Sequence, residues 1–365
     1  MEDLVMNQDF WKNKTILLTG HTGFKGSWLS IWLQMAGARV IGYSLPPPTT
    51  PSLFVEAHVS QDMTSLTGDV RDFDRLRDVV QKHAPEIVIH MAAQSLVRRS
   101  YTESRDTFAT NIMGTVNLLE AIRVGGGVKV FINVTTDKCY QNREWLWGYR
   151  ENEPLGGYDP YSSSKACSEI VTSAYRDSFF NPAKFASHEV AIATARAGNV
   201  IGGGDWASDR LMSDIVKAAA DGSVMKVRNP EAIRPWQHVL DALNGYTLLA
   251  EKMWEDGEGF SEAWNFGPGD ADAKPVLWIL QRFSELWATG LKFEVEGSSH
   301  PHEANYLKLD CSKARTRLGF SPRLTLQAAL QWLVEWQQDY QNYRDIRATT
   351  EKQISRYQHI QPNDR

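Results

Sequence analysis

The chain has 365 residues, 42% of them hydrophobic, and a formal net charge of −5. This length suits one large or two modest domains with a sizeable core, and the lack of a long basic run argues against nucleic acid as the main partner. Cys139, Cys167 and Cys311 have no zinc-like spacing, so we expect no metal site and a reducing cytoplasm. We expect neither a signal peptide nor a membrane span, because the N-terminus and the apolar runs lack those patterns.

Short apolar runs alternate with helical patterns along the first 200 residues. The run TILLTG (15–20) predicts a buried strand, and large apolar residues recur every four positions behind it, which predicts a helix with one apolar face. The later strand patterns are RVIGYS, EIVIHMAA, KVFINVTT and EVAIATARAGNV, and the helical patterns are DFDRLRDVVQKH, NIMGTVNLLEAIR and YSSSKACSEIVTSAYRDSF. Continuous apolar strands separated by helices predict an α/β fold with a Rossmann-type, doubly wound parallel sheet.

The rhythm changes near residue 200, where loops rich in Gly, Asp and Pro separate helices such as LMSDIVKAAADG and LTLQAALQWLVEWQQDY. We therefore predict a smaller, interleaved C-terminal substrate-binding domain. In this interpretation residues 1–198 form the large domain, to which 236–268 return. Residues 199–235 and 269–345 form the smaller lobe, and 346–365 form a polar surface helix or tail.

A glycine-rich loop, GHTGFKG (20–26), stands between the first strand and the first helix. Glycines at this place permit a tight turn and a close backbone approach, and the helix N-terminus offers free N–H groups to a pyrophosphate. A glycine pattern alone is weak, and an ordinary strand–helix turn is the alternative. The position of this loop favours a dinucleotide site.

The second strand lacks the acidic residue that commonly binds the ribose of NAD. It ends GYSLP (42–46), without Asp or Glu and without the Arg or Lys that would bind the extra phosphate of NADP. We therefore expect NAD. Asp69, in TGDVRD, is placed to contact adenine, and a helix cap is the alternative role for its side chain.

Two further motifs bring acid–base groups to the same sheet edge. Tyr161 and Lys165 form YxxxK at a helix start, where the i, i+4 spacing puts both side chains on one face. A nearby ammonium favours the phenolate, so we expect Lys165 to lower the pKa of Tyr161. Thr136, Asp137 and Lys138 follow the preceding strand, and ligands of such sheets bind at the carboxyl ends of strands. All five residues can therefore meet at one site.

The order GxxGxxG, HMAAQ, TTDK, YxxxK and RAGNV resembles the extended short-chain dehydrogenase/reductase superfamily, and within it the nucleotide-sugar 4,6-dehydratases. The likeness covers about residues 8–340. The longer stretches GHTGFKGSWLSIWL, TTDKCY, IRPWQHVLDAL and HEANYLKLDCSKA are similar to the members that act on CDP-D-glucose. The resemblance places the product on the route to the dideoxy sugars of bacterial surface polysaccharide.

The resemblance implies a dehydration with internal return of hydride. NAD takes hydride from carbon 4 of the sugar while Tyr161 takes the hydroxyl proton, and Lys165 tunes Tyr161 and holds the nicotinamide ribose. Thr136 orients the sugar hydroxyl and can pass the proton. Asp137 is the general acid for loss of water from carbon 6, to which the hydride returns. Lys138 is a departure, because the thymidine-diphosphate relatives carry Glu there as the base for the carbon 5 proton. Our hypothesis is that Lys138 is that base or stabilises the enolate, and the alternative is a salt bridge to a neighbouring carboxylate.

The resemblance also implies the binding residues. The cofactor-binding set is Gly20, Thr22, Gly23, Phe24, Gly26, Asp69, Val70, Ala92, Ala93, Gln94, Tyr161 and Lys165. The substrate-binding set is Ser95, Thr136, Asn199, Arg210, Arg234 and Tyr306. Arg suits a diphosphate because its fork meets two oxygens, although a plain surface role stays open for Arg210. Relatives often carry an arginine near HPHEANY, where this chain has Ala304 and Asn305.

Other functions stay open at this point. A 4-epimerase shares the glycine loop and YxxxK but needs no acid–base pair after Thr136, and an NAD-sensing protein need not keep Thr136, Tyr161 and Lys165 together. A carbonyl reductase would consume added cofactor. Relatives pair two helices per subunit into a four-helix bundle, so we expect a homodimer or homotetramer through the helices at NIMGTVNLLEAIR and KACSEIVTSAYRDSF.

Overall fold

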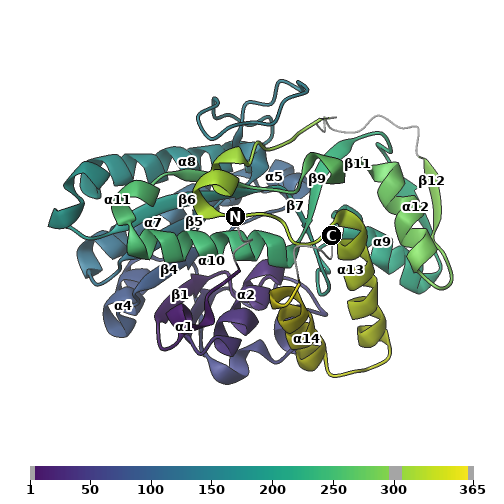
Figure 1. Ribbon diagram of the computed structural model, residues 1–365, viewed down its shortest axis with the longest axis horizontal. Helices are drawn as coiled ribbons and strands as arrows, with labels where there is room; N and C mark the ends of the chain where they lie inside the picture. Colours follow the sequence, from purple (N-terminus) through teal and green to yellow (C-terminus); the bar gives the residue numbers. More distant parts are fainter. Residues whose placement is uncertain (1–4, 296–305, 361–365) are drawn as a thin grey trace.

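The fold is built around one large β-sheet (Figure 1). The computed structural model describes residues 5–295 and 306–360. Seven parallel strands lie in the order β10-β6-β5-β4-β1-β2-β3. Their bounds are Thr15–Thr19 (β1), Arg39–Ser44 (β2), Thr64–Thr67 (β3), Ile87–His90 (β4), Val130–Val134 (β5), Ala191–Ala197 (β6) and Ala263–Phe266 (β10). This is the predicted doubly wound sheet, and its four central strands (β6, β5, β4 and β1) are buried along their whole length because helices cover both faces.

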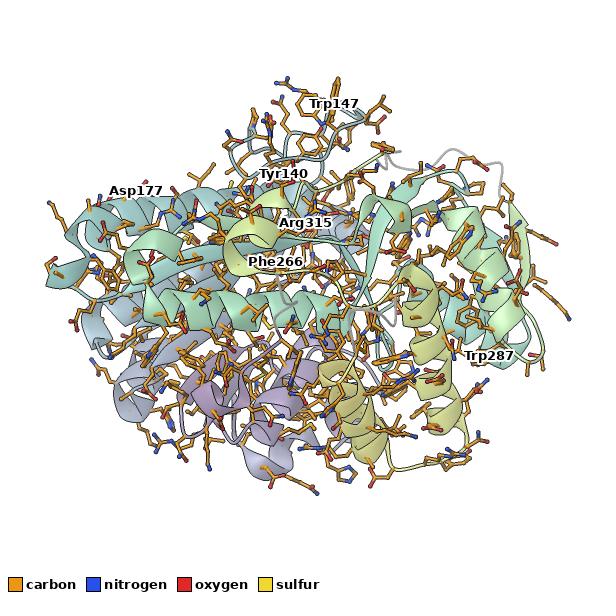
Figure 2. The ribbon with its side chains drawn as sticks, in the orientation of Figure 1. Tyr140, Trp147, Asp177, Phe266, Trp287 and Arg315 are labelled. Carbon is orange, nitrogen blue, oxygen red and sulfur yellow. The ribbon has the colours of Figure 1, made fainter. Side chains whose placement is uncertain are left out.

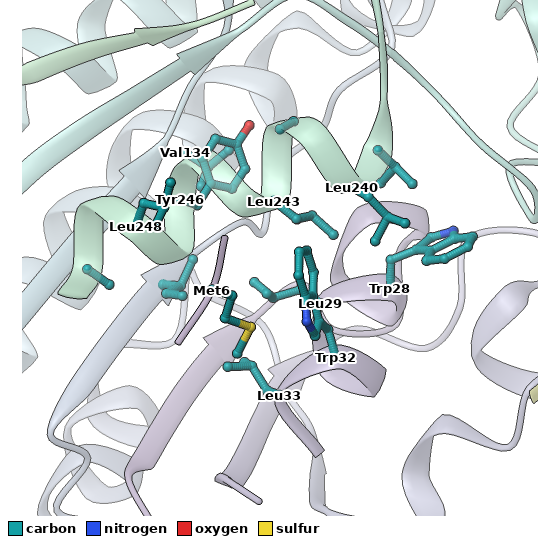
Figure 3. Close-up of a cluster of buried hydrophobic side chains, with 14 of the residues drawn as sticks. Met6, Trp28, Leu29, Trp32, Leu33, Val134, Leu240, Leu243, Tyr246 and Leu248 are labelled. Atoms are coloured by element: carbon teal, nitrogen blue, oxygen red, sulfur yellow. The ribbon is translucent and has the colours of Figure 1, made fainter. Parts of the chain in front are cut away.

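The two faces of the sheet bury separate cores. Ile16 and Leu18 of β1 belong to a core under α2 and α10, whereas Leu17 between them belongs to a core under α4 and α7. This alternation follows from the two-residue period of a strand. The helices concerned are Phe24–Met35 (α2), Phe73–His83 (α4), Gly114–Gly125 (α7), Pro160–Phe179 (α8) and Val239–Glu255 (α10). Figure 3 shows the first core between α2 and α10, with Trp32 and Leu243 facing each other.

A second, smaller body has its own strands and core. Its strands form a three-stranded sheet, β11-β9-β7, and a two-stranded sheet, β12-β8. Its elements are Asn199–Ile201 (β7), Leu211–Asp221 (α9), Val224–Val227 (β8), Ile233–His238 (β9), Ala273–Pro275 (β11), Val276–Leu286 (α12), Lys292–Val295 (β12) and Leu326–Gln341 (α13). Ile215, Phe283 and Leu330 lie in its core. Between β9 and β11 the chain returns to the large sheet. There β10 forms an edge strand of the sheet, and α10 packs on its face.

Short helices complete the described chain. They are Gln8–Trp11 (α1), Leu53–Glu56 (α3), Val59–Asp62 (η1), Val97–Thr102 (α5), Ser104–Phe108 (α6), Ala109–Met113 (η2), Asp137–Cys139 (η3), Pro182–Ser187 (η4), Gly257–Phe260 (α11), Asp270–Asp272 (η5) and Ala314–Leu318 (η6). The polar C-terminal stretch forms Ile346–Gln358 (α14), which packs on α2 and α13. Tyr357 of α14 is fully buried and donates a 2.8 Å hydrogen bond to Asp241. Within residues 5–295 and 306–360, no helix combines the length and apolarity needed to cross a membrane.

Candidate active site

The glycine loop is closed so tightly that two positions accept only glycine. Gly20 has a φ of +78°, and a Cβ atom there would lie 2.7 Å from the backbone nitrogen of Ala92. A Cβ atom on Gly26 would lie 2.1 Å from the carbonyl oxygen of Gly20. Helix α2 begins after Gly23 without a side-chain cap, so its first-turn N–H groups point into the loop. Such a helix start suits an anion.

Hydroxyl groups lie where the glycine loop meets the end of β2. Thr22 lies 2.9 Å from the Ser44 hydroxyl and donates a 2.9 Å hydrogen bond to the carbonyl of Leu45. The carboxylate of Asp69 pairs with Arg71 at 2.6 Å, and this partner lowers the pKa of Asp69. Helix α4 is capped by Asp72 instead, so Asp69 does not serve as the cap of that helix.

The loop after β4 lies against the glycine loop. Ala92 and Ala93 are half-buried there, and Val70 is buried nearby below Gly114. The Gln94 amide holds its own loop together, since it donates to the hydroxyl of Thr107 at 2.8 Å and accepts from a backbone N–H at 2.7 Å. Phe24, at the start of α2, packs towards Gly202 on the other side.

Thr136 and Asp137 form a buried pair at the end of β5. The Thr136 hydroxyl donates a 3.0 Å hydrogen bond to Oδ1 of Asp137 and accepts one of 3.3 Å from the backbone N–H of Lys138. Thr136 is 6% exposed and Asp137 1%. Among the described residues Oδ2 of Asp137 has no hydrogen-bond partner. A Cβ atom on Gly198 would lie 3.0 Å from this oxygen, so glycine leaves room for the carboxylate.

Tyr161 and Lys165 face this pair from α8, which begins at Pro160 and is capped by Asp159. The Thr136 side chain lies close enough to the Tyr161 phenol to lower its pKa. Lys165 donates a 2.9 Å hydrogen bond to the carbonyl of Val134, the last residue of β5. The side chains of YxxxK therefore lie against the end of β5, which carries Thr136.

One expectation about Tyr161 is wrong for the free protein. Burial raises the pKa of Tyr161 to about 12, and the charge of Asp137 adds to this, whereas the Thr136 side chain and Arg210 lower it. Burial also lowers the pKa of Lys165 to about 8, which Glu169 opposes. Desolvation outweighs the pairing that the motif suggested, because both groups lie away from water.

Lys138 is half-buried beside the pair. In the part of the chain that the structure describes, no carboxylate lies within ion-pair distance of its ammonium group. The alternative role predicted for Lys138, a salt bridge, is therefore not seen among these residues. Its backbone N–H holds the Thr136 hydroxyl.

The residues predicted to bind substrate approach from the smaller body. Arg210 donates to Asp205 at 2.8 Å and to the Ser95 hydroxyl at 2.8 Å, so it joins the loop after β4 to the start of α9. Its charge also acts on Tyr161, which places it at the site. Asn199 opens β7 directly after Gly198, and Trp236 of β9 is its partner in register.

Arg234 and Tyr306 are neighbours on the far side of β9. Arg234 is 9% exposed and donates a 2.9 Å hydrogen bond to the carbonyl of Ile233. Tyr306 forms an isolated bridge with Ile233, and its hydroxyl donates a 3.4 Å hydrogen bond to the carbonyl of Leu146. The structure thus brings these two residues together. Ala304 and Asn305 lie outside the described residues.

Two residues of the site escaped the sequence analysis as functional side chains. Lys25 lies on the first turn of α2, and burial together with Lys165 and Arg210 lowers its pKa to about 7. Its ammonium lies 5.7 Å from the ring centre of Tyr246. Tyr246 on α10 is fully buried, and its hydroxyl has no hydrogen-bond partner among the described residues. Figure 3 shows this hydroxyl directed away from the apolar cluster. The sequence does contain an indication for Lys25, because it is a charged residue inside an apolar glycine motif. It contains no such indication for Tyr246.

A buried ion pair supports the site from behind. Glu169, one helical turn after Lys165, lies 2.7 Å from Arg196 of β6, with both side chains under 5% exposed. The carboxylate also accepts hydrogen bonds from Thr135, next to Thr136, and from Thr194 at 2.7 Å. Glu169 thus ties α8 to the ends of β5 and β6.

A cavity of about 620 Å³ opens on the outer side of this ion pair. It is separate from the residues around Thr136, because none of Thr136, Asp137 and Tyr161 lines it. Charged side chains on its wall are paired, as Lys313 is with Glu262 and Arg150 with Glu153. We therefore place the chemistry at the glycine loop and the end of β5 rather than in this recess.

A glycine loop at a switch of strand order, with a buried Tyr–Lys pair on the adjoining helix, defines a protein of the short-chain dehydrogenase/reductase class. Within this class the chain belongs to the GDP-mannose 4,6-dehydratase family, whose model matches residues 17–332. A CDP-glucose 4,6-dehydratase of Salmonella typhimurium is 52% identical over 353 residues, which cover 97% of this chain and 98% of that protein.

Solved structures with the same fold include both dehydratases and epimerases. A dTDP-glucose 4,6-dehydratase of Bacillus anthracis, in complex with NAD, has a TM-score of 0.74 at 20% identity, covering 91% of this chain and 98% of the other. A UDP-glucose 4-epimerase of Thermotoga maritima, with UDP-glucose, has a TM-score of 0.75 at 22% identity, covering 89% and 99%. At these identities the likeness shows the fold alone and does not choose between the two reactions.

Proposed function

We propose that this chain converts CDP-D-glucose to CDP-4-keto-6-deoxy-D-glucose and water, using bound NAD that is regenerated in each turnover. The substrate follows from the relative that is 52% identical over nearly the whole of both chains. The reaction follows from Asp137, because an epimerase has no hydroxyl to expel and needs no buried acid beside its tyrosine.

The observation that carries the proposal is the Thr136–Asp137 hydrogen bond of 3.0 Å within reach of Tyr161. It places a carboxyl group, a hydroxyl and a phenol in one buried cluster. A dehydration needs one group to accept the proton of the carbon 4 hydroxyl and another to deliver a proton to the leaving oxygen on carbon 6. Tyr161 and Asp137 meet those two needs.

The residues present fit a dinucleotide. The tight Gly20 and Gly26 positions bring backbone close to a pyrophosphate, which the uncapped start of α2 would bind. Thr22 and Ser44 offer hydroxyl groups to the adenine ribose in place of the usual carboxylate. Lys165 would bind the other ribose. When bound, the oxidised nicotinamide supplies a hydride acceptor for carbon 4, the same hydride for carbon 6, and a positive charge beside Tyr161.

Different protein residues carry out the separate proton transfers. Tyr161 takes the proton of the carbon 4 hydroxyl, which Thr136 orients. The ketone formed at carbon 4 acidifies the proton on carbon 5, and we propose that Lys138 removes it. A lysine acts as a base only as the neutral amine. Asp137 gives a proton to the oxygen that leaves carbon 6. Asn199, Arg210 and Arg234 would bind the diphosphate.

The assignment of Lys138 can be tested apart from turnover. In Lys138→Ala, exchange of the carbon 5 proton with deuterated water should fall at least tenfold, because a general base contributes about 10²–10⁴-fold to such a step. Proton magnetic resonance of the recovered sugar nucleotide measures this exchange. Lys138→Arg serves as the control that keeps a charge but cannot act as a base. Normal exchange in Lys138→Ala would exclude the base role.

The whole function is tested by incubating the pure protein with CDP-glucose and catalytic NAD. We expect a 4-keto-6-deoxy sugar in the proton spectrum and no net accumulation of NADH. Formation of CDP-galactose would identify an epimerase instead. If CDP-, dTDP-, UDP- and GDP-sugars all remain unchanged while NAD binds, the catalytic proposal is wrong and a sensing role gains support.

We also propose that the protein assembles through α7 and α8, in keeping with the expected helix bundle. Exposed apolar side chains lie on α6, on the turn η2 before α7 and on α8, which contact one another: Phe108 is 36%, Met113 50% and Ile170 56% exposed. Exposed apolar patches of this kind mark interfaces. The proposed domain bounds stay 1–198 with 236–268, then 199–235 with 269–345. A nucleotide sugar and NAD are both cellular metabolites, so the proposal places the chain in the cytoplasm.

A further inference from the structure

Residues 306–310 (the substrate-side segment) carry Tyr306 and are fixed by the loop that follows η3. Tyr149 of that loop exchanges two backbone hydrogen bonds of 2.9 Å with the segment. The side chain of Asn142 donates a 3.1 Å hydrogen bond to the carbonyl of Tyr306. The contact is close, since a Cβ atom on Gly148 would lie 2.6 Å from a backbone nitrogen of the segment. The loop after η3 therefore helps to set the position of Tyr306.

Asn265 of β10 binds this segment and the residue next to η3 with one side chain. Asn265 is fully buried, and its amide nitrogen donates hydrogen bonds to the carbonyls of Tyr149 (2.8 Å) and Asp310 (3.1 Å). Its amide oxygen accepts a 2.7 Å hydrogen bond from the hydroxyl of Tyr140, which directly follows η3. Both amide hydrogens are used in this way, so the amide is held in one orientation.

Tyr140 is itself firmly held. Its ring stacks on Tyr149, with 5.2 Å between the ring centres and 20° between the planes. The guanidinium of Arg196 lies 4.9 Å from its ring centre and donates a 2.7 Å hydrogen bond to its hydroxyl. Burial raises the pKa of Tyr140 well above its ordinary value, so the phenol keeps the proton that it donates to Asn265. Figure 2 shows Tyr140 below the projecting loop that carries Trp147.

We propose that Asn265, acting through Tyr140, is the common anchor that sets η3 and the substrate-side segment in register with each other. This inference rests on the proposed dehydration, in which η3 carries Asp137 and Lys138 and the segment presents Tyr306 to the sugar nucleotide. Asn265 and Tyr140 are positioning residues, because they act on the substrate through these other side chains.

The two halves of the proposed reaction depend on different elements. Oxidation at carbon 4 uses Tyr161 and Lys165, which lie on α8, whereas loss of water uses Asp137 and Lys138, which lie on η3. A loosened η3 should therefore slow the loss of water more than the oxidation. General loss of structure would weaken both steps and NAD binding together. The ratio of the two rates thus separates positioning from mere stability.

Tyr140→Phe tests the arm of the anchor that reaches η3, because it keeps the stacked ring and removes only the hydroxyl. A misplacement of about 1 Å can cost about 10²-fold in rate, so we expect loss of water to slow by about tenfold or more and oxidation by less than about threefold. Rapid mixing with CDP-glucose and NAD should then show reduced nicotinamide and 4-keto-glucose accumulating before the product. Tyr357→Phe is the matched control, since it removes a buried hydroxyl bonded to Asp241 at 2.8 Å on α14 and should leave the ratio of the two rates unchanged.

Gly148→Ala tests the arm that reaches the substrate-side segment, because its Cβ atom pushes on the segment from 2.6 Å. We expect the affinity for CDP, measured by calorimetry with NAD present, to fall about tenfold, the effect of losing one or two hydrogen bonds. The ratio of the two rates should stay that of wild type. Asn265→Ala breaks both arms and should show both defects. NAD affinity and thermal unfolding of each variant report whether its fold is intact.

Equal slowing of both steps in Tyr140→Phe would overturn the proposal, and so would an unchanged CDP affinity in Gly148→Ala. The wild-type protein separates this failure from failure of the proposed function. If wild type makes no 4-keto-6-deoxy sugar from CDP-glucose, the dehydration itself is wrong and the anchor is overturned with it. If wild type makes the product and the variants lack their selective defects, the dehydration stands and the anchor alone is wrong.

Discussion

Lys25 is an ammonium group in a place where positive charge is costly. Burial, Lys165 and Arg210 lower its pKa from 10.5 to about 7, although Asp137 and Asp205 oppose this. The unfolded chain keeps the proton up to its ordinary pKa near 10.5. Between about pH 7 and 10.5 the unfolded state therefore binds more protons than the folded state, and folding stability rises with pH in this window.

Replacement of Lys25 by Met should remove that pH dependence. From pH 7 to 9 the Lys25 contribution to the free energy of unfolding should grow by about 2 kcal/mol, at about 1.4 kcal/mol per unit above the folded pKa. Urea unfolding of wild type and Lys25→Met at both pH values measures the difference. Lys165 titrates in the same window but is common to both proteins. Parallel pH profiles would mean that Lys25 is ordinarily solvated.

The Tyr246 hydroxyl offers a second test at the scale of one atom. It is fully buried without a hydrogen-bond partner among the described residues, so Tyr246→Phe should leave the free energy of unfolding unchanged or raise it by about 1 kcal/mol. Tyr357→Phe is the matched control, because that hydroxyl donates to Asp241 at 2.8 Å, and its loss should cost about 1–2 kcal/mol. Equal losses in the two variants would show that Tyr246 has a partner in solution.

Helix α8 carries one half of the buried ion pair between Glu169 and Arg196. The charges lie 2.7 Å apart and are both under 5% exposed. Arg196, Thr135 and Thr194 hold the pKa of Glu169 below its usual value against the effect of burial. The stability that this pairing gives is present above the ordinary pKa of Glu and is lost as the pH falls through the lowered folded value.

Removal of one partner should be far more damaging here than on the surface. Glu169→Gln leaves Arg196 buried and uncompensated, so it should cost about 3–5 kcal/mol. Glu103→Gln breaks the exposed pair with Arg99 (2.8 Å) and should cost less than about 0.5 kcal/mol. Glu169→Gln should also lower the pKa of Lys165, which Glu169 raises. Chemical unfolding of both variants checks the contrast, and similar losses would contradict it.

The order of elements was readable from the sequence because the pattern is local. Apolar runs such as TILLTG and VFINV became β1 and β5, and their helices followed with short loops. The C-terminal stretch was harder to predict. Its polar composition suggests a surface helix or tail, but α14 buries Tyr357 against Asp241. These two residues lie 116 positions apart in the sequence, so no local pattern predicts their contact.

The candidate site, like the fold, could be predicted only in part from the sequence. Thr136, Tyr161 and Lys165 meet because strand ends and the i, i+4 rule bring them together, and both are sequence rules. The pKa of Tyr161 was mispredicted because desolvation depends on every neighbour in space. Tyr246 escaped because it fills an apolar position of α10, and only the fold shows that its hydroxyl is buried without a partner among the described residues.

At the scale of the whole molecule, exposed apolar side chains lie on α8 and on the elements that contact it. Small and apolar side chains follow the helical period along the exposed side of α8, from Cys167 through Ile170 to Ala174. Met113 lies exposed on the adjoining turn η2, before α7. A second apolar feature, the loop with Leu146 and Trp147, projects from the molecule at a different place (Figure 2).

These two features allow a matched test of assembly. A charge in the centre of a helix-bundle interface is buried unpaired, so Ile170→Glu should reduce the mass in solution to that of the monomer. Leu146→Glu changes a side chain that is 76% exposed on the projecting loop and should leave the mass unchanged. Light scattering after size-exclusion chromatography measures both. If Leu146→Glu dissociates the assembly and Ile170→Glu does not, the subunits meet through the loop, and the exposed apolar side chains on η2 and α8 need another explanation. Because Tyr161 and Lys165 lie on the buried face of the same α8, dissociation by Ile170→Glu should also lower activity by loosening the helix that carries them.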